Sequence, residues 1–415
     1  MIDPRLLRED PDLIRDSLRR RGSPIDLDAM IAQEAALRAK RQEAEGLRGR
    51  QKEAGRLIAT LSGAEKDVAI AEVAELATSV KEAMAEADRL TAEFERAVLE
   101  VPNLVAPDAA EGLNEGDSLE LRRVGSPRAE GLDYATLGEQ LDIIDTVRGA
   151  KVSGSRFGYI KGKGALLEFS LVRWAMDHLV KAGFTPMIPP VLVREEALEG
   201  TGFFPEAREQ VYEIPKDELF LVGTSEVPLA AYHGDEILER NALPLRYAGF
   251  STCFRREAGT YGKDTAGIFR VHQFDKVEMF VFTTPEASTE EHDRLLAIEE
   301  SLVQELEIPY RVVNIAAGDL GASATKKYDI EAWFPSEQAY REITSCSNTT
   351  DYQARRLKVR IKAEDGNPVL HTLNGTACAV GRTITALLEN HQRPDGSVEI
   401  PEALRRYTGF DLIDP

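Results

Sequence analysis

Apolar residues recur every seven positions between about residues 28 and 100 of the chain. This stretch contains no proline, and Ala, Glu, Arg, Lys and Leu dominate it, which is typical of long helices. Its second half carries two interleaved series with the spacing of a coiled-coil seam: Val73, Val80, Ala87 and Phe94, and Leu76, Ala83, Leu90 and Ala97. The first half repeats the pattern more weakly, with Met30, Leu37, Ala44 and Ile58 in one series, interrupted by Gln51, and Leu47, Ala54 and Leu61 in the other.

A Ser-Gly pair interrupts this helical pattern within residues 61–67, which read LSGAEKD. The simplest interpretation is two helices that fold back on each other as an antiparallel hairpin. Each helix would have about 30 residues and a length of roughly 45 Å at the usual rise per residue. We therefore predict a helical arm at residues 28–100, within an N-terminal domain of residues 1–104.

The chain changes character after the arm. Residues 101–117, VPNLVAPDAAEGLNEGD, are rich in Pro, Gly and Asn, so we expect a linker at residues 105–118. Residues 119–415 mix helical patterns, as at 165–183, with strand patterns, as at 277–282. Because strands and helices do not alternate regularly, we predict an α+β protein: a helical coiled-coil arm followed by a domain with an antiparallel sheet flanked by helices.

Composition narrows the class of protein. The 415 residues are 43% hydrophobic and 29% charged, and no apolar run is long enough to cross a bilayer. The first 22 residues lack the apolar core of a secretory signal. Three cysteines that lie far apart argue against a disulfide framework, and there is no CxxC or HxxxH pair for zinc. We expect a soluble cytoplasmic protein that does not contact membranes.

The charge of the chain is strongly acidic, but it is not uniform. A net charge of −20 argues against nucleic-acid binding through general charge, since phosphates are neutralised by Lys and Arg. Residues 31–60 nevertheless carry seven bases against four acids, whereas residues 61–100 carry four bases against ten acids. Only the first helix of the predicted arm therefore offers phosphates a favourable face.

Residues 254–280, FRREAGTYGKDTAGIFRVHQFDKVEMF, suggest two strands joined by a loop. Strand alternation would place two charged rows on one face: Cys253, Arg255 and Glu257, and Arg270, His272, Phe274, Lys276 and Glu278. Cations, carboxylates and an aromatic ring together suit a polyanionic ligand that has a flat base. A solvated hairpin whose charges pair with one another is the alternative from this stretch alone.

Three other segments carry weaker signals, and each also has an ordinary structural interpretation. TSEVPLAAYH starts a helix at Thr224 or Ser225 after an apolar strand. REITSCSN sets Glu342 and Ser345 three residues apart, where their oxygens can reach one divalent ion. NGTACAVGRTITALLENHQ is a small-residue strand followed by a helix that opens at Gly381 and Arg382, where phosphate can bind.

Together these segments resemble the signature motifs of class II aminoacyl-tRNA synthetases, and those of the seryl-tRNA synthetase family in particular. The first motif is similar to the helix at 165–183 with FTPMIPPVLV, where Pro189 matches the family's proline at a dimer interface. The second is the charged hairpin, and the third is residues 373–392. Because the resemblance covers nearly the whole chain, it implies a homodimer that activates L-serine with ATP and Mg²⁺ and charges tRNA(Ser), and tRNA(Sec) where present.

The resemblance also assigns roles to matching residues. It implies catalytic roles for Arg255, Arg382 and Glu278, and a serine site of Thr224, Ser225, Glu226, Arg255, Glu278 and Thr376. It implies an ATP site of Arg255, Arg256, Glu257, Val271, Phe274, Glu342, Ile343, Thr344, Ser345 and Arg382, with Mg²⁺ on Glu342 and Ser345. Phosphates of the long variable arm of the tRNA would meet the helical arm at Arg38, Arg41, Arg48 and Lys52.

The chain departs from the family pattern at two places. Ala266 stands where the family's second-motif loop usually has arginine, and Thr376 with Ala377 stand where its third motif often has Ser-Gly. The second change keeps a hydroxyl group. Three alternatives remain at this point: a paralogue that passes an aminoacyl-adenylate to a carrier or small molecule, a catalytically dead coiled-coil scaffold, and threonyl or prolyl specificity.

Overall fold

The computed structural model describes residues 1–259, 267–364 and 366–415. Contacts divide the chain into two compact units. One unit contains residues 2–19 and 23–101, and the other contains residues 102–415 together with Met1 and residues 20–22.

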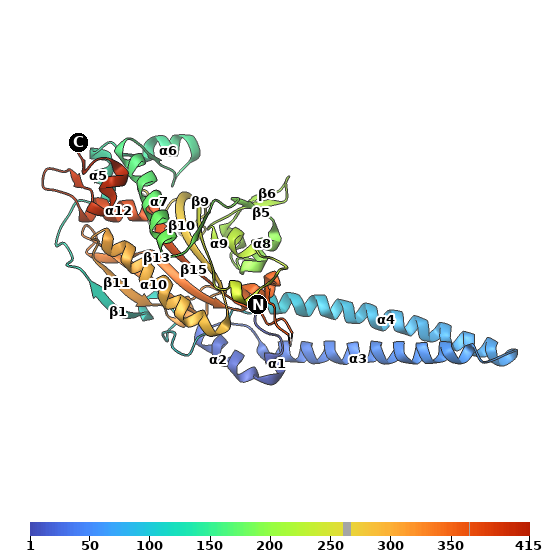
Figure 1. The fold of residues 1–415 in the computed structure, drawn as a ribbon. Coiled ribbons are helices and arrows are strands. Elements are labelled where there is room, and N and C mark those ends of the chain that lie inside the picture. Colours follow the sequence, from blue (N-terminus) through green and yellow to red (C-terminus); the bar gives the residue numbers. More distant parts are fainter. Residues whose placement is uncertain (260–266, 365) are drawn as a thin grey trace. The chain divides into compact units, whose positions relative to one another are not determined.

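The first unit is helical, and two long helices dominate it. Its helices are α1 (Leu6–Glu9), most of α2 (Pro11–Arg21), α3 (Leu27–Ile58) and α4 (Ala64–Glu100). Asp26 caps α3 by accepting a hydrogen bond from the Ala29 N–H, and Gly63, with a φ of 60°, lies in the turn before α4. The helices α3 and α4 lie side by side (Figure 1), so the predicted helical hairpin is confirmed.

The predicted seam packs the two long helices together. Its buried members are Met30, Leu37, Ala44 and Leu47 of α3, and Val80, Ala83, Ala87 and Phe94 of α4. Burial decreases toward the turn between the helices, where Leu57 and Val68 are exposed. The heptad pattern therefore predicts packing well at the base of the arm and less well at its tip.

The bases predicted to meet phosphate share one side of α3. Arg38, Arg41, Arg48 and Lys52 are all exposed. At 3.6 residues per turn they fall within an arc of about 80° around the helix. They form a narrow basic stripe on a helix whose partner α4 is acidic.

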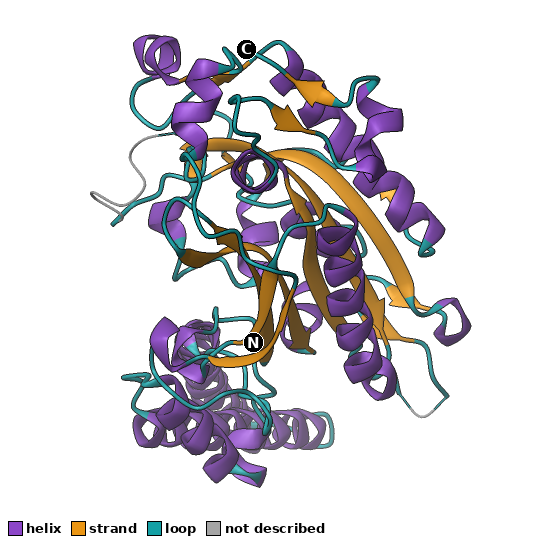
Figure 2. Ribbon diagram, turned by 90° about the vertical axis from the view of Figure 1, so that its left-hand side faces the viewer, coloured by secondary structure: helices purple, strands orange, loops and turns teal. Residues whose placement is uncertain are grey.

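The second unit is built on an eight-stranded sheet, which Figure 2 shows with helices lying along it. The strand order is β1-β11-β12-β13-β15-β10-β9-β4. The strands are β1 (Leu119–Val124), β4 (Thr185–Met187), β9 (Leu245–Phe254), β10 (Gln273–Thr283), β11 (Tyr310–Asn314), β12 (Lys326–Phe334), β13 (Ala339–Thr350) and β15 (His371–Ala379). All neighbours are antiparallel except β4 with β9, so the predicted antiparallel sheet is confirmed.

The central strand β10 separates two environments. Val277, Met279 and Val281 face the main core with the helices α7 (Lys163–Lys181), α10 (Ser288–Glu305) and α12 (Val380–Asn390). Phe280 and Phe282 face the opposite side, in a second core with α9 (Glu226–Ala231) and α11 (Tyr352–Leu357). Lys276 and Glu278 alternate onto this second side.

Smaller elements surround the sheet. The remaining helices are α5 (Tyr134–Gln140), α6 (Thr146–Ser153), α8 (Glu195–Thr201) and α13 (Glu402–Thr408). Short strands pair as β2 (Ile144–Asp145) with β3 (Tyr159–Ile160), β8 (Ile237–Leu238) with β14 (Arg360–Ile361), β16 (Val398–Glu399) with β17 (Leu412–Ile413), and β7 (Leu219–Leu221) with β5 (Leu192–Val193) and β6 (Tyr212–Ile214). Among the described residues no helix is long and apolar enough to cross a membrane.

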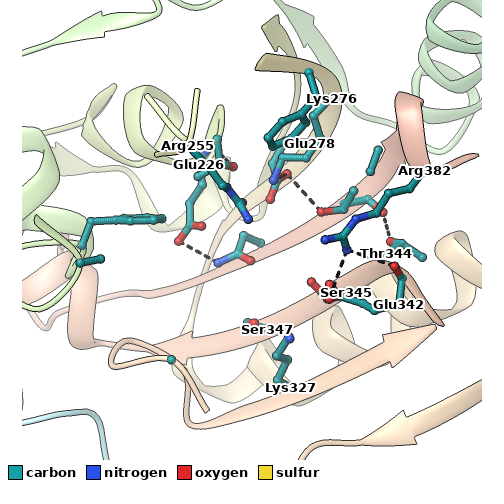
Figure 3. Close-up of a pocket in the computed structure, with 18 of the residues that line it drawn as sticks. Glu226, Arg255, Lys276, Glu278, Lys327, Glu342, Thr344, Ser345, Ser347 and Arg382 are labelled. Atoms are coloured by element: carbon teal, nitrogen blue, oxygen red, sulfur yellow. Dashed lines mark hydrogen bonds and ion pairs between the residues drawn. The ribbon is translucent and has the colours of Figure 1, made fainter. Parts of the chain in front are cut away.

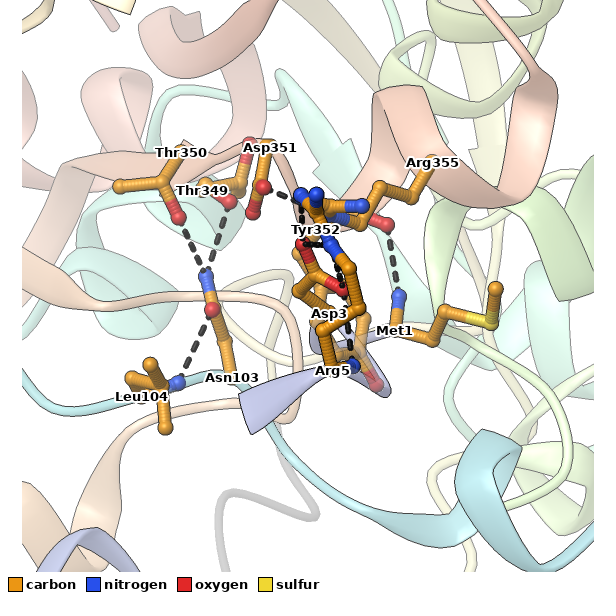
Figure 4. A network of polar contacts seen from close by, with 10 residues as sticks. All are labelled: Met1, Asp3, Arg5, Asn103, Leu104, Thr349, Thr350, Asp351, Tyr352 and Arg355. Atoms are coloured by element: carbon orange, nitrogen blue, oxygen red, sulfur yellow. Dashed lines mark hydrogen bonds and ion pairs between the residues drawn. The ribbon is translucent and has the colours of Figure 1, made fainter. Parts of the chain in front are cut away.

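The segment predicted as a linker is packed against the second unit. Val105 and Ala109 are buried with Val313 of β11 and Ile315, which follows this strand. Just before this segment, the Asn103 side chain donates hydrogen bonds to the Thr349 carbonyl (2.8 Å) and the Thr350 hydroxyl (3.0 Å), as Figure 4 shows. Apolar residues and a buried amide therefore hold the residues around the predicted linker against the second unit's sheet.

The charged hairpin differs from its predicted form. The strand β9 ends at Phe254 and β10 begins at Gln273, so Arg255, Glu257, Arg270 and His272 lie beyond the strands. Glu257 has a φ of 48°, which is incompatible with strand alternation. The prediction that these side chains share one face of the strands is therefore correct for Lys276 and Glu278. It is wrong for Glu257, because the chain turns after Arg255.

Candidate active site

A cavity of about 620 Å³ opens on the side of the sheet that carries Lys276 and Glu278. Its lining includes Thr224, Glu226, Arg255, Glu342 and Arg382, and Figure 3 shows the last four of these side chains directed toward one space. The volume is in the range of small-molecule sites. Residues from β10, β12, β13 and β15 form one wall, while Thr201, Gly202, Phe203 and Glu206 contribute from the end of α8 and the segment that follows it.

The floor of the cavity is formed where β10 meets β15. Glu278 pairs with Thr376 next to an irregularity in the register, and the Thr376 hydroxyl donates to Glu278 Oε2 at 3.4 Å. Lys276 Nζ lies 2.5 Å from the same oxygen, and both side chains are buried. Burial raises the pKa of Glu278, while the adjacent Lys276 ammonium acts to lower it. The floor thus presents a hydroxyl, a carboxyl and a cation in a nearly dry environment.

A second buried carboxyl enters the cavity from the start of α9. Glu226 is 8% exposed, and its backbone N–H donates to the Thr224 hydroxyl at 3.2 Å. Burial and the nearby Glu278 raise the pKa of Glu226 to about 7. The helix comes this close because Gly249 faces it: a Cβ there would lie 2.8 Å from Leu229 Cδ1 and 3.1 Å from Ser225 Cβ.

Arg255 lies between these carboxyls and the open part of the cavity. Its Nε donates to the Gly223 carbonyl at 3.1 Å, and its backbone N–H donates to the His272 carbonyl at 2.9 Å. The guanidinium carbon lies 5.4 Å from the centre of the Phe274 ring. Arg255 is therefore held by backbone and ring contacts, which leaves its remaining N–H groups for an anion.

The far end of the cavity contains Arg382, which opens α12, and Glu342 on β13. Arg382 Nη1 donates to the Glu342 carbonyl at 3.0 Å and lies 3.3 Å from the Glu342 carboxylate. Burial acts to raise the pKa of Glu342, but Arg382, Lys327 and Arg255 outweigh it and lower this pKa. Glu342 is thus kept ionised, and with the Ser345 hydroxyl in the same lining it offers the oxygen ligands that Mg²⁺ prefers.

Two segments of the chain match models of known protein families. Residues 1–105 match the model of the seryl-tRNA synthetase N-terminal domain, and residues 211–391 match the tRNA synthetase class II core domain (G, H, P, S and T). Serine--tRNA ligase 1 of Streptomyces avermitilis is 53% identical over 425 residues, covering 100% of this chain and 99% of that protein. The chain belongs to the seryl-tRNA synthetase family.

Solved structures support this family membership. The seryl-tRNA synthetase of Pyrococcus horikoshii, complexed with ATP, is 40% identical, and the two chains cover each other fully with a TM-score of 0.97. The cytoplasmic serine-tRNA ligase of Naegleria fowleri, in complex with AMP, is 34% identical with a TM-score of 0.91, covering 100% of this chain and 99% of that one. The helical arm and the class II domain are therefore both features of the family fold.

Most residues that the sequence pointed to line this cavity. They are Thr224, Glu226, Arg255, Glu257, Val271, Phe274, Glu278, Glu342, Ile343, Thr344, Ser345, Thr376 and Arg382. Ser225 and Arg256 do not line it. Ser225 is fully buried, with its hydroxyl 2.8 Å from that of Ser251, and Arg256 lies over the Tyr212 ring at 5.5 Å. Ala266 lies outside the described residues.

Several residues of the cavity were missing from the predicted site, among them Lys276, Asn374 and Lys327. Lys276 precedes Glu278 by two positions, and strand alternation had placed it in the same charged row without assigning it to the site. The same rule applies to Asn374, which precedes Thr376 by two positions and donates to Glu226 Oε1 at 2.9 Å. Lys327 lies on β12, where its Nζ is 2.9 Å from Asp329 Oδ1, and no nearby motif indicated it.

The ion pair on the cavity floor leads to a prediction about stability. Replacing Lys276 by Met leaves Glu278 buried without its adjacent cation, which typically costs about 3–5 kcal/mol. Because loss of the cation raises the pKa of Glu278 further, the loss relative to wild type should be smaller at pH 5.5 than at pH 8. Urea unfolding of Lys276→Met and wild type at both pH values measures this.

The matched control is the double variant Lys276→Met/Glu278→Gln. It removes both charges, so it should recover most of the lost stability at pH 8. A Lys276→Met protein as stable as wild type at pH 8 would show that the pair does not compensate the buried carboxylate.

Proposed function

We propose that the protein is a serine–tRNA ligase. It activates L-serine with ATP to seryl-adenylate and transfers the seryl group to the 3′ end of tRNA(Ser), and of tRNA(Sec) where present. The observation that carries the proposal is the floor of the cavity, where the buried Glu278 and the Thr376 hydroxyl face the same small space as Glu226 and Arg255. Full-length similarity to proteins named serine–tRNA ligase supports it.

Serine fits this arrangement group by group. Its ammonium group is attracted to the carboxylates of Glu226 and Glu278, and its hydroxyl bonds to Thr376 and Glu278. Arg255 binds the serine carboxylate. Thr224 shapes this end of the cavity and holds the start of α9 through the Glu226 N–H. Ser225 supports the pocket from below, because its hydroxyl is already engaged with Ser251.

ATP occupies the remaining length of the cavity. Phe274 stacks on the adenine beside Glu257 and the backbone of Val271, while Arg255 reaches the α-phosphate and Arg382 reaches the γ-phosphate. Ile343 and Thr344 lie on the same strand as the candidate magnesium ligands Glu342 and Ser345. When bound there, Mg²⁺ neutralises phosphate charge and orients the triphosphate.

The reaction needs no protein nucleophile. The serine carboxylate attacks the α-phosphorus, the bond to the bridging oxygen breaks, and pyrophosphate leaves. A terminal ribose hydroxyl of the tRNA then attacks the carbonyl carbon of the adenylate, and AMP leaves. Arg255 and Arg382 contribute by fixing the reacting groups and compensating the negative charge, which is the usual basis of catalysis at phosphorus.

The proposal includes tRNA binding by the N-terminal domain, residues 1–104, and dimerisation by the catalytic domain. Exposed apolar side chains gather on α6, on α7 and after β4, including Val147 (80% exposed), Phe169 (72%) and Ile188 (86%). Apolar side chains exposed to this extent suit a protein interface, so we infer that a second copy of the chain covers them, with Pro189 next to Ile188. The three cysteines are unpaired, in keeping with a cytoplasmic location.

ATP–pyrophosphate exchange with all standard amino acids tests the proposal directly. Serine should be the amino acid that supports exchange. Alanine should be rejected, since it leaves Glu278 and Thr376 without a partner at about 1–3 kcal/mol for each buried polar group. Threonine should be excluded by shape. Charging of tRNA(Ser) in the same preparation completes the assay.

The rival functions give different results in these two assays. Exchange with serine but no charging of tRNA favours the paralogue that supplies a carrier or small molecule. No exchange with any amino acid favours the scaffold. Comparable activation of serine and alanine would reject the pocket as assigned.

Arg255 and its neighbour Arg256 form a matched pair of variants. Arg255→Ala removes a positioned charge at the reacting centre, so exchange should fall about a hundredfold to a thousandfold. Arg256→Ala should change exchange much less, because this side chain lies over Tyr212 and does not line the cavity. Circular dichroism verifies folding, and near-normal exchange by folded Arg255→Ala would reject its assigned role.

The basic stripe on α3 should contribute to tRNA binding through phosphates. Replacing Arg38, Arg41, Arg48 and Lys52 by Gln should weaken tRNA binding and reduce its salt dependence, while serine-dependent exchange stays unchanged. The control replaces the four bases of α4, namely Lys66, Lys81, Arg89 and Arg96, and should have a smaller effect. Equal effects of the two sets on tRNA affinity would contradict a specific role for the stripe.

A further inference from the structure

Glu226 uses its two carboxylate oxygens differently. Oε1 accepts hydrogen bonds from Gln353 Nε2 at 2.7 Å and from Asn374 Nδ2 at 2.9 Å. Both of these side-chain donors, which lie among the described residues, therefore bond to Oε1 of Glu226. The orientation therefore leaves Oε2 for whatever enters the cavity.

Gln353 is fully buried on α11 and does not line the cavity. Its Oε1 accepts a hydrogen bond from the Thr372 hydroxyl at 2.9 Å, and the Thr349 hydroxyl bonds to Thr372 at 2.6 Å. Because a hydroxyl donor fixes the carbonyl end of the amide, the NH₂ end must point to Glu226. Its second N–H meets the Thr201 carbonyl at 3.2 Å.

These contacts make Gln353 the junction of four elements. Thr372 belongs to β15, Thr349 to β13, Glu226 to α9, and Thr201 ends α8 just before the segment that lines the cavity. A fully bonded amide at such a junction has one orientation, and it transmits this orientation to the carboxylate it holds.

We propose that Gln353 is a positioning residue for amino-acid selection: from outside the cavity, its amide fixes the orientation of the Glu226 carboxyl so that the free oxygen binds the α-ammonium group of serine. This inference rests on the proposed function. Gln353 touches no substrate, so it acts only through Glu226 and the segment that begins at Thr201.

The charges around Glu226 explain why the loss of one amide donor would change its protonation. Burial and Glu278 of β10 raise the pKa of Glu226, whereas Gln353 of α11, Lys276 of β10 and Arg255, which follows β9, lower it, and the resulting pKa is about 7. Loss of the Gln353 donor removes one of the contacts that lower the pKa of Glu226. The carboxyl would then be protonated, and unable to attract an ammonium, over a wider range of pH.

The test is serine-dependent ATP–pyrophosphate exchange by Gln353→Leu between pH 6.5 and 9. A hydrogen bond to a charged group is worth roughly a tenfold to hundredfold change in binding, so the KM for serine at pH 7 should rise by at least about tenfold. The KM for ATP should stay within about twofold. The defect in serine KM should shrink toward pH 9, where Glu226 ionises even without the amide.

Gln392→Leu is the matched control. Gln392 is also a buried glutamine with a bonded amide, which donates to the Leu132 and Glu389 carbonyls at 3.0 Å, and it does not line the cavity. It should lower thermal stability without altering the serine KM or its pH dependence. A comparable serine defect in the control would show that any buried amide produces it, and would overturn the inference.

A second variant covers the case in which Gln353→Leu does not fold. If Gln353→Leu does not fold, Gln353→Glu keeps the size and the Thr372 contact but not the permanent donor, and it should raise the serine KM most at neutral pH. An unchanged serine KM, or a defect independent of pH that affects ATP equally, overturns the inference. Wild-type protein without serine-dependent exchange refutes the proposed function instead.

Discussion

Two buried carboxyl groups that share one cavity are the constraint on which the rest of this structure depends. Glu226 and Glu278 are both nearly inaccessible to water, and each raises the cost of ionising the other. Lys276 and Arg255 compensate them only in part, so a ligand that brings a positive charge completes the balance. In the proposed function, this charge balance favours an ammonium group before any contact with the side chain of the amino acid is considered. The hydroxyl of Thr376, which donates to Glu278, would then favour a small polar side chain.

The fold meets this constraint by opening its central sheet at one point. The register of β10 with β15 shifts next to Glu278, and the pairing of β13 with β15 stops at Cys346 and Gly375, so the strands part where the cavity lies. Gly249 lets α9 approach the sheet and deliver Glu226. At the other end, Arg382 and Glu342 balance each other and mark the space for a polyphosphate. In the proposed function, the same sheet thus separates a region for an ammonium from a region for phosphates.

The sequence predicted those features that follow from a regular repeat of residues within one helix or strand. Seven-residue spacing identified the two long helices, and strand alternation placed Lys276 and Glu278 on one face, since both follow from local geometry. The same rule failed for Glu257, because a single residue at positive φ ends the alternation. Ser225 and Arg256 lie within motifs but point away from the cavity, which a motif cannot reveal. Gln353 was invisible from the sequence, because its role depends on contacts with residues as distant as Thr201, 152 positions away.

Proton exchange on binding of serine tests the central claim most directly. Calorimetric titration of serine at pH 7, repeated in buffers with different ionisation enthalpies, gives the number of protons released. Because the pKa of Glu226 lies at about 7 in the free protein, serine binding should release protons at pH 7 and far fewer at pH 8.5. Binding without proton release at pH 7 would contradict the account, since Glu226 would then be either fully ionised beforehand or not in contact with the ammonium group.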